Sequence, residues 1–183
     1  MKKVRLRELL AIAVLCGTAR APQASLLRAM SLEQLVTSSN EIIVAKVISV
    51  KAAWDPPHRR ILSTIEVKIE ECWKGAAGEF ITIVQPGGTV GDIEMTVHGM
   101  PKFTAGERSL LFLRGQTNFQ VVGMSEGKRP VAWDADSKRW MVESPNVEDT
   151  VDVDAAGRLH PAAQAAQLDL ESMRARVRKM IRN

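Results

Sequence analysis

The segment from residue 61 to residue 73 constrains the fold most, because its side chains alternate between apolar and polar positions. One face carries Ile61, Ser63, Ile65, Val67 and Ile69, and the other carries Leu62, Thr64, Glu66, Lys68 and Glu70. A period of two is that of a β-strand, in which successive side chains point to opposite faces. The alternation predicts a half-buried strand in a long antiparallel pair with the strand before it.

Other segments of strand length lie on both sides of this one. They cover residues 41–50, 80–85, 92–97, 109–113, 119–124, 130–133 and 138–142. The segment 109–113 is an almost continuous apolar run, which predicts burial on both of its faces. Residues 134–137 predict a hairpin turn between the last two segments. Strands of this length and spacing are typical of a small barrel or sandwich.

Two helices are expected at the ends of this β region. Ser31 and Gln34 have the spacing of a capping box, which predicts a short helix that ends near Ser39. Pro161 occupies a favoured first helical position and opens a carboxy-terminal helix over residues 161–182. Its apolar stripe consists of Ala166, Leu170, Met173, Val177 and Met180. The stripe is expected to pack on the β domain, and the alternatives are docking to a partner or to an acidic membrane surface.

The first 21 residues have the three parts of a secretory signal peptide. A basic stretch precedes a short apolar run that ends near Cys16, and small residues before and at Ala21 mark a cleavage site. A lipoprotein signal at Cys16 is the weaker alternative, because Leu15 before it is not small. We therefore expect export to the periplasm or the extracellular space.

Export changes how the charge of the chain is interpreted. The whole sequence has a formal net charge of +4, but residues 1–21 hold five basic residues and one acidic residue. The mature domain is then formally neutral, so its overall charge does not favour nucleic-acid binding. Cleavage also leaves Cys72 as the one cysteine, which excludes an internal disulfide. We expect Cys72 to be a buried, inert thiol.

No sequence motif for catalysis, metal binding or a cofactor is present. The three histidines, His58, His98 and His160, share no zinc-ligand spacing, and residues 152–157 fit only the start of a calcium loop. We therefore expect no enzyme activity, metal or cofactor. The enzyme alternative is a hydrolase that uses Asp92, Glu94 and His98 as a loop-borne acid–base group.

Three segments carry a resemblance to known proteins. They are residues 40–47, residues 67–75 and the sequence Gly-Glu-Arg-Ser-Leu-Leu-Phe-Leu at 106–113. Their order resembles that of exported bacterial proteins of uncharacterised function and, more distantly, that of netrin-type and metalloproteinase-inhibitor-type domains. The resemblance spans roughly residues 31–125 and implies an OB-fold barrel. It transfers no functional residue, because the amino-terminal cysteine of the inhibitors has no counterpart in the mature chain.

We therefore predict a mainly β protein with a small OB-like β-barrel of five to seven strands, a short amino-terminal helix and a carboxy-terminal amphipathic helix. The expected division is a signal peptide at 1–21, a barrel domain at 31–143, an acidic linker at 144–160 and a helix at 161–182. The expected function is that of an exported, non-enzymatic binding module of unknown ligand, with protein–protein interaction as the expected mode. A membrane-associated structural role through the basic helix is an alternative.

The expected binding face is a glycine-rich segment, because binding residues concentrate on loops held by a rigid scaffold. The candidate residues are Gly87, Gly88, Gly91, His98, Pro101, Lys102 and Phe103.

Overall fold

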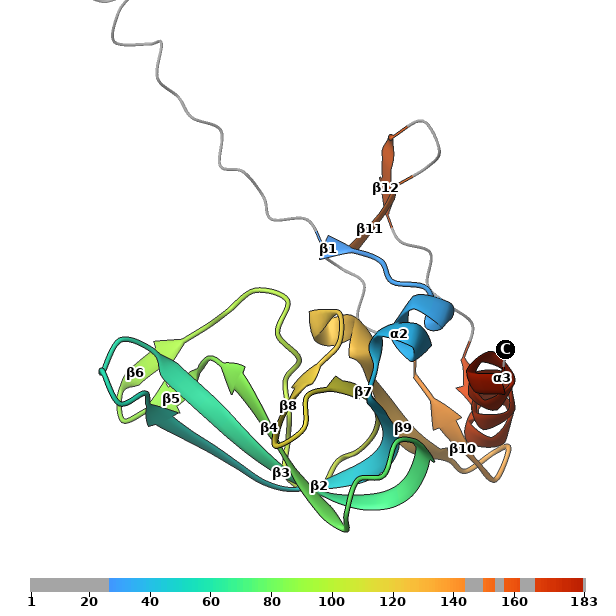
Figure 1. Ribbon diagram of the computed structural model, residues 1–183, viewed down its shortest axis with the longest axis horizontal. Coiled ribbons are helices and arrows are strands. Elements are labelled where there is room, and N and C mark those ends of the chain that lie inside the picture. Colours follow the sequence, from blue (N-terminus) through green and yellow to red (C-terminus); the bar gives the residue numbers. More distant parts are fainter. Residues whose placement is uncertain (1–26, 144–149, 154–156, 162–166, 183) are drawn as a thin grey trace, which may run out of the picture.

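A computed structural model describes residues 27–143, 150–153, 157–161 and 167–182. The predicted signal peptide and Cys16 lie outside the described residues. The fold is mainly β, with 49% of residues in strands, a short amino-terminal helix and a carboxy-terminal helix (Figure 1). This architecture confirms the mainly β prediction and the two expected helices.

Five strands form a ring at the centre of the molecule. They are β2 (Glu41–Trp54), β3 (Ile61–Lys74), β4 (Phe80–Pro86), β7 (Arg108–Arg114) and β8 (Asn118–Val121). Around the ring, β2 pairs with β3, β3 with β4, β4 with β8, β8 with β7, and β7 with β2. The β4–β8 pair is parallel, and the other four pairs are antiparallel. The predicted antiparallel pairing of the two long strands is confirmed.

The inside of the ring holds one of two apolar cores. Its buried members come from all five ring strands: Ile43, Ala45, Val47, Ile65, Val67, Ile81, Ile83, Leu111, Leu113 and Phe119. On β3 these are the odd-numbered residues that the alternation placed on the apolar face. The apolar face of this strand was therefore predicted correctly, and it faces the interior of the ring.

The second core lies on the outer face of β2 and β7. Ile42, Val44, Leu110 and Phe112 belong to it, and each is at most 1% exposed. The sheet continues beyond β7 through β9 (Lys128–Asp134), β10 (Arg139–Val142) and β13 (Leu168–Asp169). The helices α2 (Leu32–Ser38) and α3 (Leu170–Arg182) supply five of the core's other buried side chains, and the rest come from β3, β9, β10 and Val122. Burial of residues 110–113 on both faces confirms the prediction made from their apolar run.

The structure contains both the predicted capping box at Ser31 and the predicted turn at residues 134–137. The backbone N–H of Gln34 donates to Ser31 Oγ at 3.1 Å, and that of Ser31 donates to Gln34 Oε1 at 2.9 Å. This capping box starts α2 where the sequence placed it. The turn between β9 and β10 is closed by Asp134 Oδ1, which accepts from the N–H groups of Asp136 and Ser137.

The start of the carboxy-terminal helix was predicted wrongly. Pro161 ends the short strand β12 (Leu159–Pro161), and α3 begins only at Leu170. Asp169 caps the helix, since its carboxylate accepts from the N–H of Ser172 at 3.1 Å and from the Ser172 hydroxyl at 2.6 Å. These hydrogen bonds hold the pKa of Asp169 below its usual value. A cap with a side-chain acceptor is a stronger start signal than proline, which also fits an edge strand.

The segment predicted as an acidic linker at 144–160 contains secondary structure where it is described. Strand β11 (Thr150–Val153) pairs with β12 and, in parallel, with β1 (Leu27–Arg28). These three strands form a small separate sheet. Residues 144–149 and 154–156 lie outside the described residues. The acidic composition of the segment therefore did not exclude strand pairing.

Beyond the end of β7, β2 and β3 continue as an arm formed by residues 48–54 and 61–66, in which β3 stays paired with β4 as far as Leu62. The short hairpin of β5 (Gly88–Val90) and β6 (Ile93–Met95) lies beside this arm (Figure 1). The predicted strand at 92–97 corresponds to β6. The predicted strand at 119–124 ends at Val121 and is followed by the 3₁₀ turn η1 (Met124–Gly127).

Gly88 allows β5 to lie directly against the arm, and this makes a testable prediction. A Cβ atom at Gly88 would lie 2.6 Å from Ser63 Oγ and 2.8 Å from Ala52 Cβ, on a backbone with φ +132°. We expect Gly88→Ala to lower the free energy of unfolding by about 1–3 kcal/mol through clash and backbone strain. Urea unfolding followed by circular dichroism measures this. The control Gly78→Ala, where a Cβ meets nothing within 4 Å, should change it by less than about 0.5 kcal/mol.

Packing of α3 on the second core makes a second prediction. Met173 is 3% exposed and lies in this core, whereas Arg176 on the same helix is exposed. Met173→Ala is expected to lower the free energy of unfolding by about 2–5 kcal/mol, since it removes buried apolar volume. Arg176→Ala should have little effect. Equal stability of the two variants in urea would show that α3 is not packed on the domain.

Candidate functional site

A groove of about 530 Å³ lies between the arm and the loop that follows β4. Its lining comes from two parts of the chain. The arm contributes Val50, Ala52, Ser63 and Ile65, and the later segment contributes residues 85–89, 94–97 and 100–104. A concave surface built from apolar walls and a few polar groups is the usual form of a ligand site. This groove is therefore the first candidate.

A β-bulge in β2 turns the arm's side chains toward the groove. The register between β2 and β3 shifts between Val47 and Ser49, which leaves Ile48 as the extra residue. Before the bulge the odd-numbered Val47 faces the ring interior, and after it the even-numbered Val50 and Ala52 line the groove. One inserted residue changes which face of a strand each later side chain occupies. Ile48 itself is 44% exposed and does not line the groove.

The floor of the groove is fixed by hydrogen bonds to Gly87. The Ser63 hydroxyl donates to the carbonyl oxygen of Gly87 at 2.7 Å, and the N–H of Gly87 donates to the carbonyl oxygen of Ile61 at 2.9 Å. Gly87 and Gly88 have φ values of +106° and +132°. Such backbone is accessible to glycine at little cost. The two glycines therefore shape the groove rather than offer groups that contact a ligand.

The opposite wall is held by two side chains from the ring and from β9. Gln85 Nε2 donates to the carbonyl oxygen of Pro101 at 2.8 Å. Lys128 Nζ donates to the carbonyl oxygen of Lys102 at 2.6 Å, lies 2.8 Å from a Glu107 carboxylate oxygen and stands 4.9 Å from the centre of the Phe103 ring. Charge-assisted hydrogen bonds of this kind are among the stronger ones in proteins. The loop wall is therefore anchored.

Gln85 also presents a polar atom without a partner. Its amide nitrogen is committed to Pro101, which fixes the orientation of the amide group. Its oxygen Oε1 is buried, and no donor among the described residues bonds to it. An unsatisfied buried acceptor is unfavourable by about 1–3 kcal/mol. Gln85 lines the groove, and because this oxygen has almost no surface open to solvent, its side chain must move slightly to reach a bound N–H group.

The structure brings five of the seven predicted binding residues to the groove. Gly87, Gly88, Pro101, Lys102 and Phe103 line it, whereas Gly91 and His98 are not among its lining residues. Gly91 lies in the turn between β5 and β6, and both it and His98 flank the lining segments.

The sequence analysis missed the arm side of the groove. Val50 and Ile65 belong to segments that were predicted as strands with a buried centre or a buried face, and Ala52 lies just beyond the predicted strand 41–50. Ile65 lies opposite Val50 in the pairing of β2 and β3. The bulge that exposes Val50 is an irregularity of pairing and has no signature in the sequence of β2 alone.

The acid–base hypothesis gains no support from the geometry. Asp92, Glu94 and His98 are all exposed, and only Glu94 lines the groove. Glu94 accepts a hydrogen bond from the neighbouring Thr96 hydroxyl at 3.3 Å. His58, in another loop, stacks on Trp54 with ring centres 5.3 Å apart. Across the described part of the chain, no three His, Cys, Asp or Glu side chains are grouped so that they could hold a metal ion.

Cys72 was expected to be buried, and this was wrong. The thiol is exposed although Cys72 lies opposite Ile43, on the side of the sheet that faces the ring interior, because it is near the end of β3. Its Sγ lies 3.4 Å from the carbonyl oxygen of Lys74. Desolvation of the sulfur and the nearby Glu41 carboxylate raise the pKa of the thiol. A raised pKa disfavours the reactive thiolate.

The tip of the arm is closed by Asp55. Its Oδ1 accepts from the N–H groups of Arg59 at 2.7 Å and Arg60 at 3.1 Å, and its Oδ2 lies 3.3 Å from Arg60 Nε. Desolvation raises the pKa of this carboxyl, but the two backbone hydrogen bonds and the Arg60 charge outweigh it, so the pKa lies below its usual value. The carboxylate form therefore stabilises the turn.

This pKa shift predicts a pH dependence of stability. A carboxyl whose pKa is lower in the folded protein stabilises it above the unfolded pKa of about 3.9, and the contribution is lost as pH falls through the folded value. Asp55→Asn should therefore be less stable than the wild type at neutral pH, and the difference should shrink below about pH 4. Urea unfolding across pH measures it. The exposed Asp136→Asn is the control, and a constant difference at all pH values would contradict the assignment.

Comparisons with known proteins do not supply a family. No protein-family model, curated protein or solved structure matches this chain. Within the residues described here, no helix is both long and apolar enough to cross a membrane.

Proposed function

We propose that this chain is an exported, non-enzymatic binding module with an OB-like barrel, and that it binds a partner protein in the groove beside the arm. The observation that carries the proposal is the groove itself. It combines an anchored loop wall, an exposed apolar side chain on the arm and a buried amide oxygen that lacks a donor.

The strand order supports the OB-like part of this proposal. The first three ring strands are neighbours in chain order, and the last two are exchanged, so that β8 closes on β4 and β7 on β2. A five-stranded, partly open ring is typical of the OB fold. The distant resemblance to netrin-type domains is consistent with this order, and the export proposal relies on the signal-like residues 1–21.

The chemistry of the groove favours a polypeptide over a small charged ligand. Val50 is 39% exposed and stands beside Ala52 and the partly buried Phe103, which together offer apolar contact. Gln85 Oε1 would accept one N–H group, and every peptide unit except proline carries one. Apolar pockets with a few fixed polar groups suit an extended peptide segment, because the pocket can contact its side chains and hydrogen-bond to its backbone.

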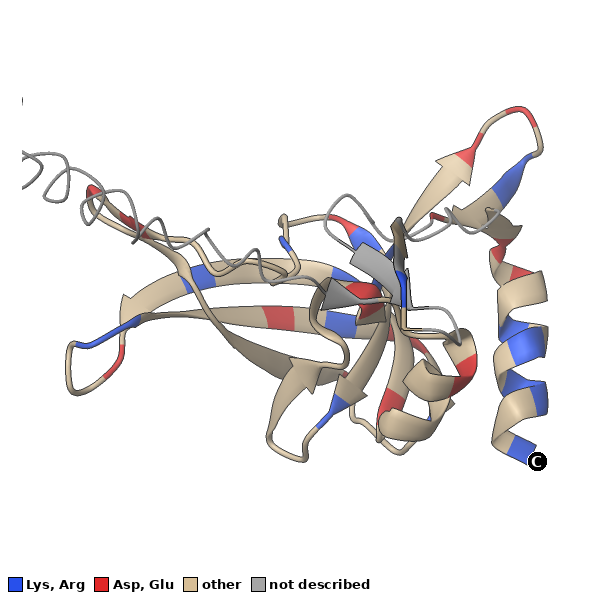
Figure 2. Cartoon of the chain, turned by 90° about the horizontal axis from the view of Figure 1, so that it is seen from above, with Lys and Arg blue, Asp and Glu red and all other residues tan. Residues whose placement is uncertain are grey.

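The alternative membrane role is less well supported. Figure 2 shows Lys and Arg along α3, and these would suit an acidic surface. However, the apolar stripe of α3 is in the second core, with Leu170, Met173 and Val177 at most 6% exposed. In this arrangement the stripe is not available to lipid.

Site-specific photo-crosslinking in cells tests the proposal. A photoreactive residue at Thr89, which is exposed and lines the groove, is expected to capture a defined protein of the exported fraction. The matched control carries the same residue at Thr64, which is exposed on the other face of β3. Capture of the same set of proteins from both positions would argue against a groove ligand.

A matched pair of variants then tests the captured partner quantitatively. Val50→Asp places a charge in the groove and should weaken binding about tenfold or more, because the charge must be desolvated. Ile48→Asp makes the same change at a residue that is 44% exposed outside the groove, and it should bind as the wild type does. Equal affinities of the two variants would refute the groove as the binding site.

A further inference from the structure

A second pocket, of about 620 Å³, lies beside β9, β10 and the first turn of α3. It shares no lining residue with the groove. In Figure 1 its elements lie at the end of the molecule away from β5 and β6. Its lining residues are Glu71, Arg108, Trp133, Lys138, Arg139, Trp140, Asp169, Leu170 and Glu171. We call it the tryptophan pocket.

Two exposed tryptophans form its aromatic surface. Trp133 and Trp140 lie directly opposite each other in the β9–β10 pair, with ring centres 5.4 Å apart and ring planes at 67°. Trp133 is 52% exposed and Trp140 is 37% exposed, although the chain contains only four tryptophans. Two adjacent aromatic side chains that stay exposed in a concave surface form an apolar patch of the kind that marks a ligand site.

The aromatic surface is held in place before any ligand arrives. The Arg108 guanidinium stacks on Trp140, with its central carbon 3.9 Å from the ring centre, and its Nε pairs with Glu70 at 2.5 Å. Arg108 therefore covers one face of Trp140. Trp133, the more exposed of the two, is left as the surface on which a ligand can stack. A rigid site loses less entropy when it binds.

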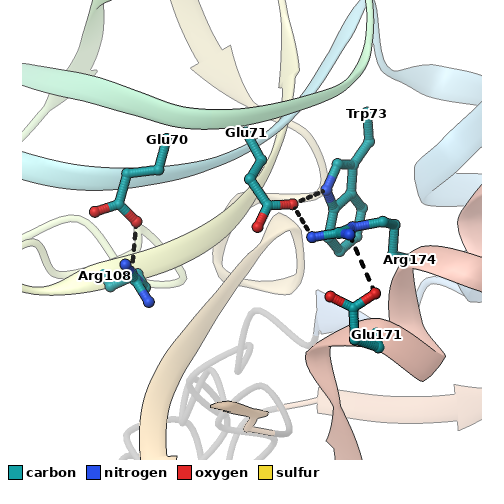
Figure 3. A network of polar contacts seen from close by, with 6 residues as sticks. All are labelled: Glu70, Glu71, Trp73, Arg108, Glu171 and Arg174. Carbon is teal, nitrogen blue, oxygen red and sulfur yellow. Dashed lines mark hydrogen bonds and ion pairs between the residues drawn. The ribbon is translucent and has the colours of Figure 1, made fainter. Parts of the chain in front are cut away.

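The carboxylates of the pocket are positioned by a network around Arg174 (Figure 3). Glu71 accepts from the indole N–H of Trp73 at 2.8 Å and from Arg174, which also donates to Glu171 at 3.1 Å. Each carboxylate has about four acceptor sites and each guanidinium has five donors, so these pairs do not exhaust the groups. Fixed donors and acceptors therefore lie beside the aromatic surface.

The charge of the pocket indicates the class of ligand. Its lining has as many acidic side chains, Glu71, Asp169 and Glu171, as basic ones, Arg108, Lys138 and Arg139. Between the lining residues Arg139 and Asp169, the nearest nitrogen and oxygen atoms are 4.0 Å apart. A balanced rim gives no net attraction to an anion or a cation, but it can both donate to and accept from a neutral polar ligand.

From this combination we propose that the tryptophan pocket binds a neutral saccharide. A sugar ring has an apolar C–H face that can pack on Trp133, and its hydroxyl groups both donate and accept hydrogen bonds. Carboxylates would accept from these hydroxyls, and Arg139, whose side chain is 67% exposed, would donate to them. The ligand thus matches the flat apolar surface, the mixed polar rim and the absence of net charge. This proposal is independent of the protein-binding groove.

Titration of the chain with cellotetraose, maltotetraose and chitotetraose tests the proposal. We expect at least one of these neutral tetrasaccharides to bind by calorimetry and to change tryptophan fluorescence. Trp133→Ala should weaken this binding about tenfold or more, and Arg139→Gln should weaken it less. The control Trp54→Ala removes a tryptophan at the tip of the arm and should leave the affinity unchanged.

Salt dependence separates a neutral ligand from a charged one. The affinity for the tetrasaccharide should stay nearly constant between about 50 and 500 mM salt, because screening acts on net charges. The proposal is overturned if none of the three tetrasaccharides binds, if Trp133→Ala binds as tightly as Trp54→Ala, or if only a charged oligosaccharide is bound. Circular dichroism of Trp133→Ala checks that a loss of binding is not a loss of fold.

Discussion

Burial of β2 and β7 on both faces is the constraint on which the rest of the structure depends. Ile43 and Leu111 face the ring interior, and Ile42 and Leu110 face the second core. An apolar strand pair of this kind would expose a large apolar surface if either face stayed open. The ring of five strands covers one face, and α2 and α3 with the sheet extension cover the other. The helices are therefore part of the core rather than appendages.

Both pockets arise where this two-layered core ends. On the arm, β2 no longer pairs with β7, and the bulge at Ile48 turns Val50 toward the groove. At the other end, the β9–β10 hairpin runs past α3, and Trp133 and Trp140 lie outside the second core and are partly exposed. A ligand in either pocket would bury apolar surface that folding itself leaves in water.

The two pockets are suited to different ligands because their polar groups are used differently. In the groove, the strongest polar contacts, such as Lys128 with Lys102 and Glu107, serve to anchor a wall, and one amide oxygen stays unpaired. The tryptophan pocket is lined by as many acidic as basic side chains beside its aromatic surface. The first arrangement favours a backbone N–H with apolar side chains, and the second favours many weak hydrogen bonds to a neutral ligand.

Sequence alone determined the features that depend on neighbouring residues: the alternation of β3, the apolar run of β7, the capping box at Ser31 and the turn at Asp134. It also directed attention to the loop that holds Gly87, Gly88 and Phe103. It did not reveal that the Cys72 thiol is exposed, that α3 begins at Leu170 behind the cap Asp169, or that Val50 lies across from that loop. Those features depend on which face of a strand packs against another segment. A single bulge reverses the face on which later side chains lie, and a contact between distant segments decides whether that face is covered. Only the packing of residues far apart in the chain could decide it.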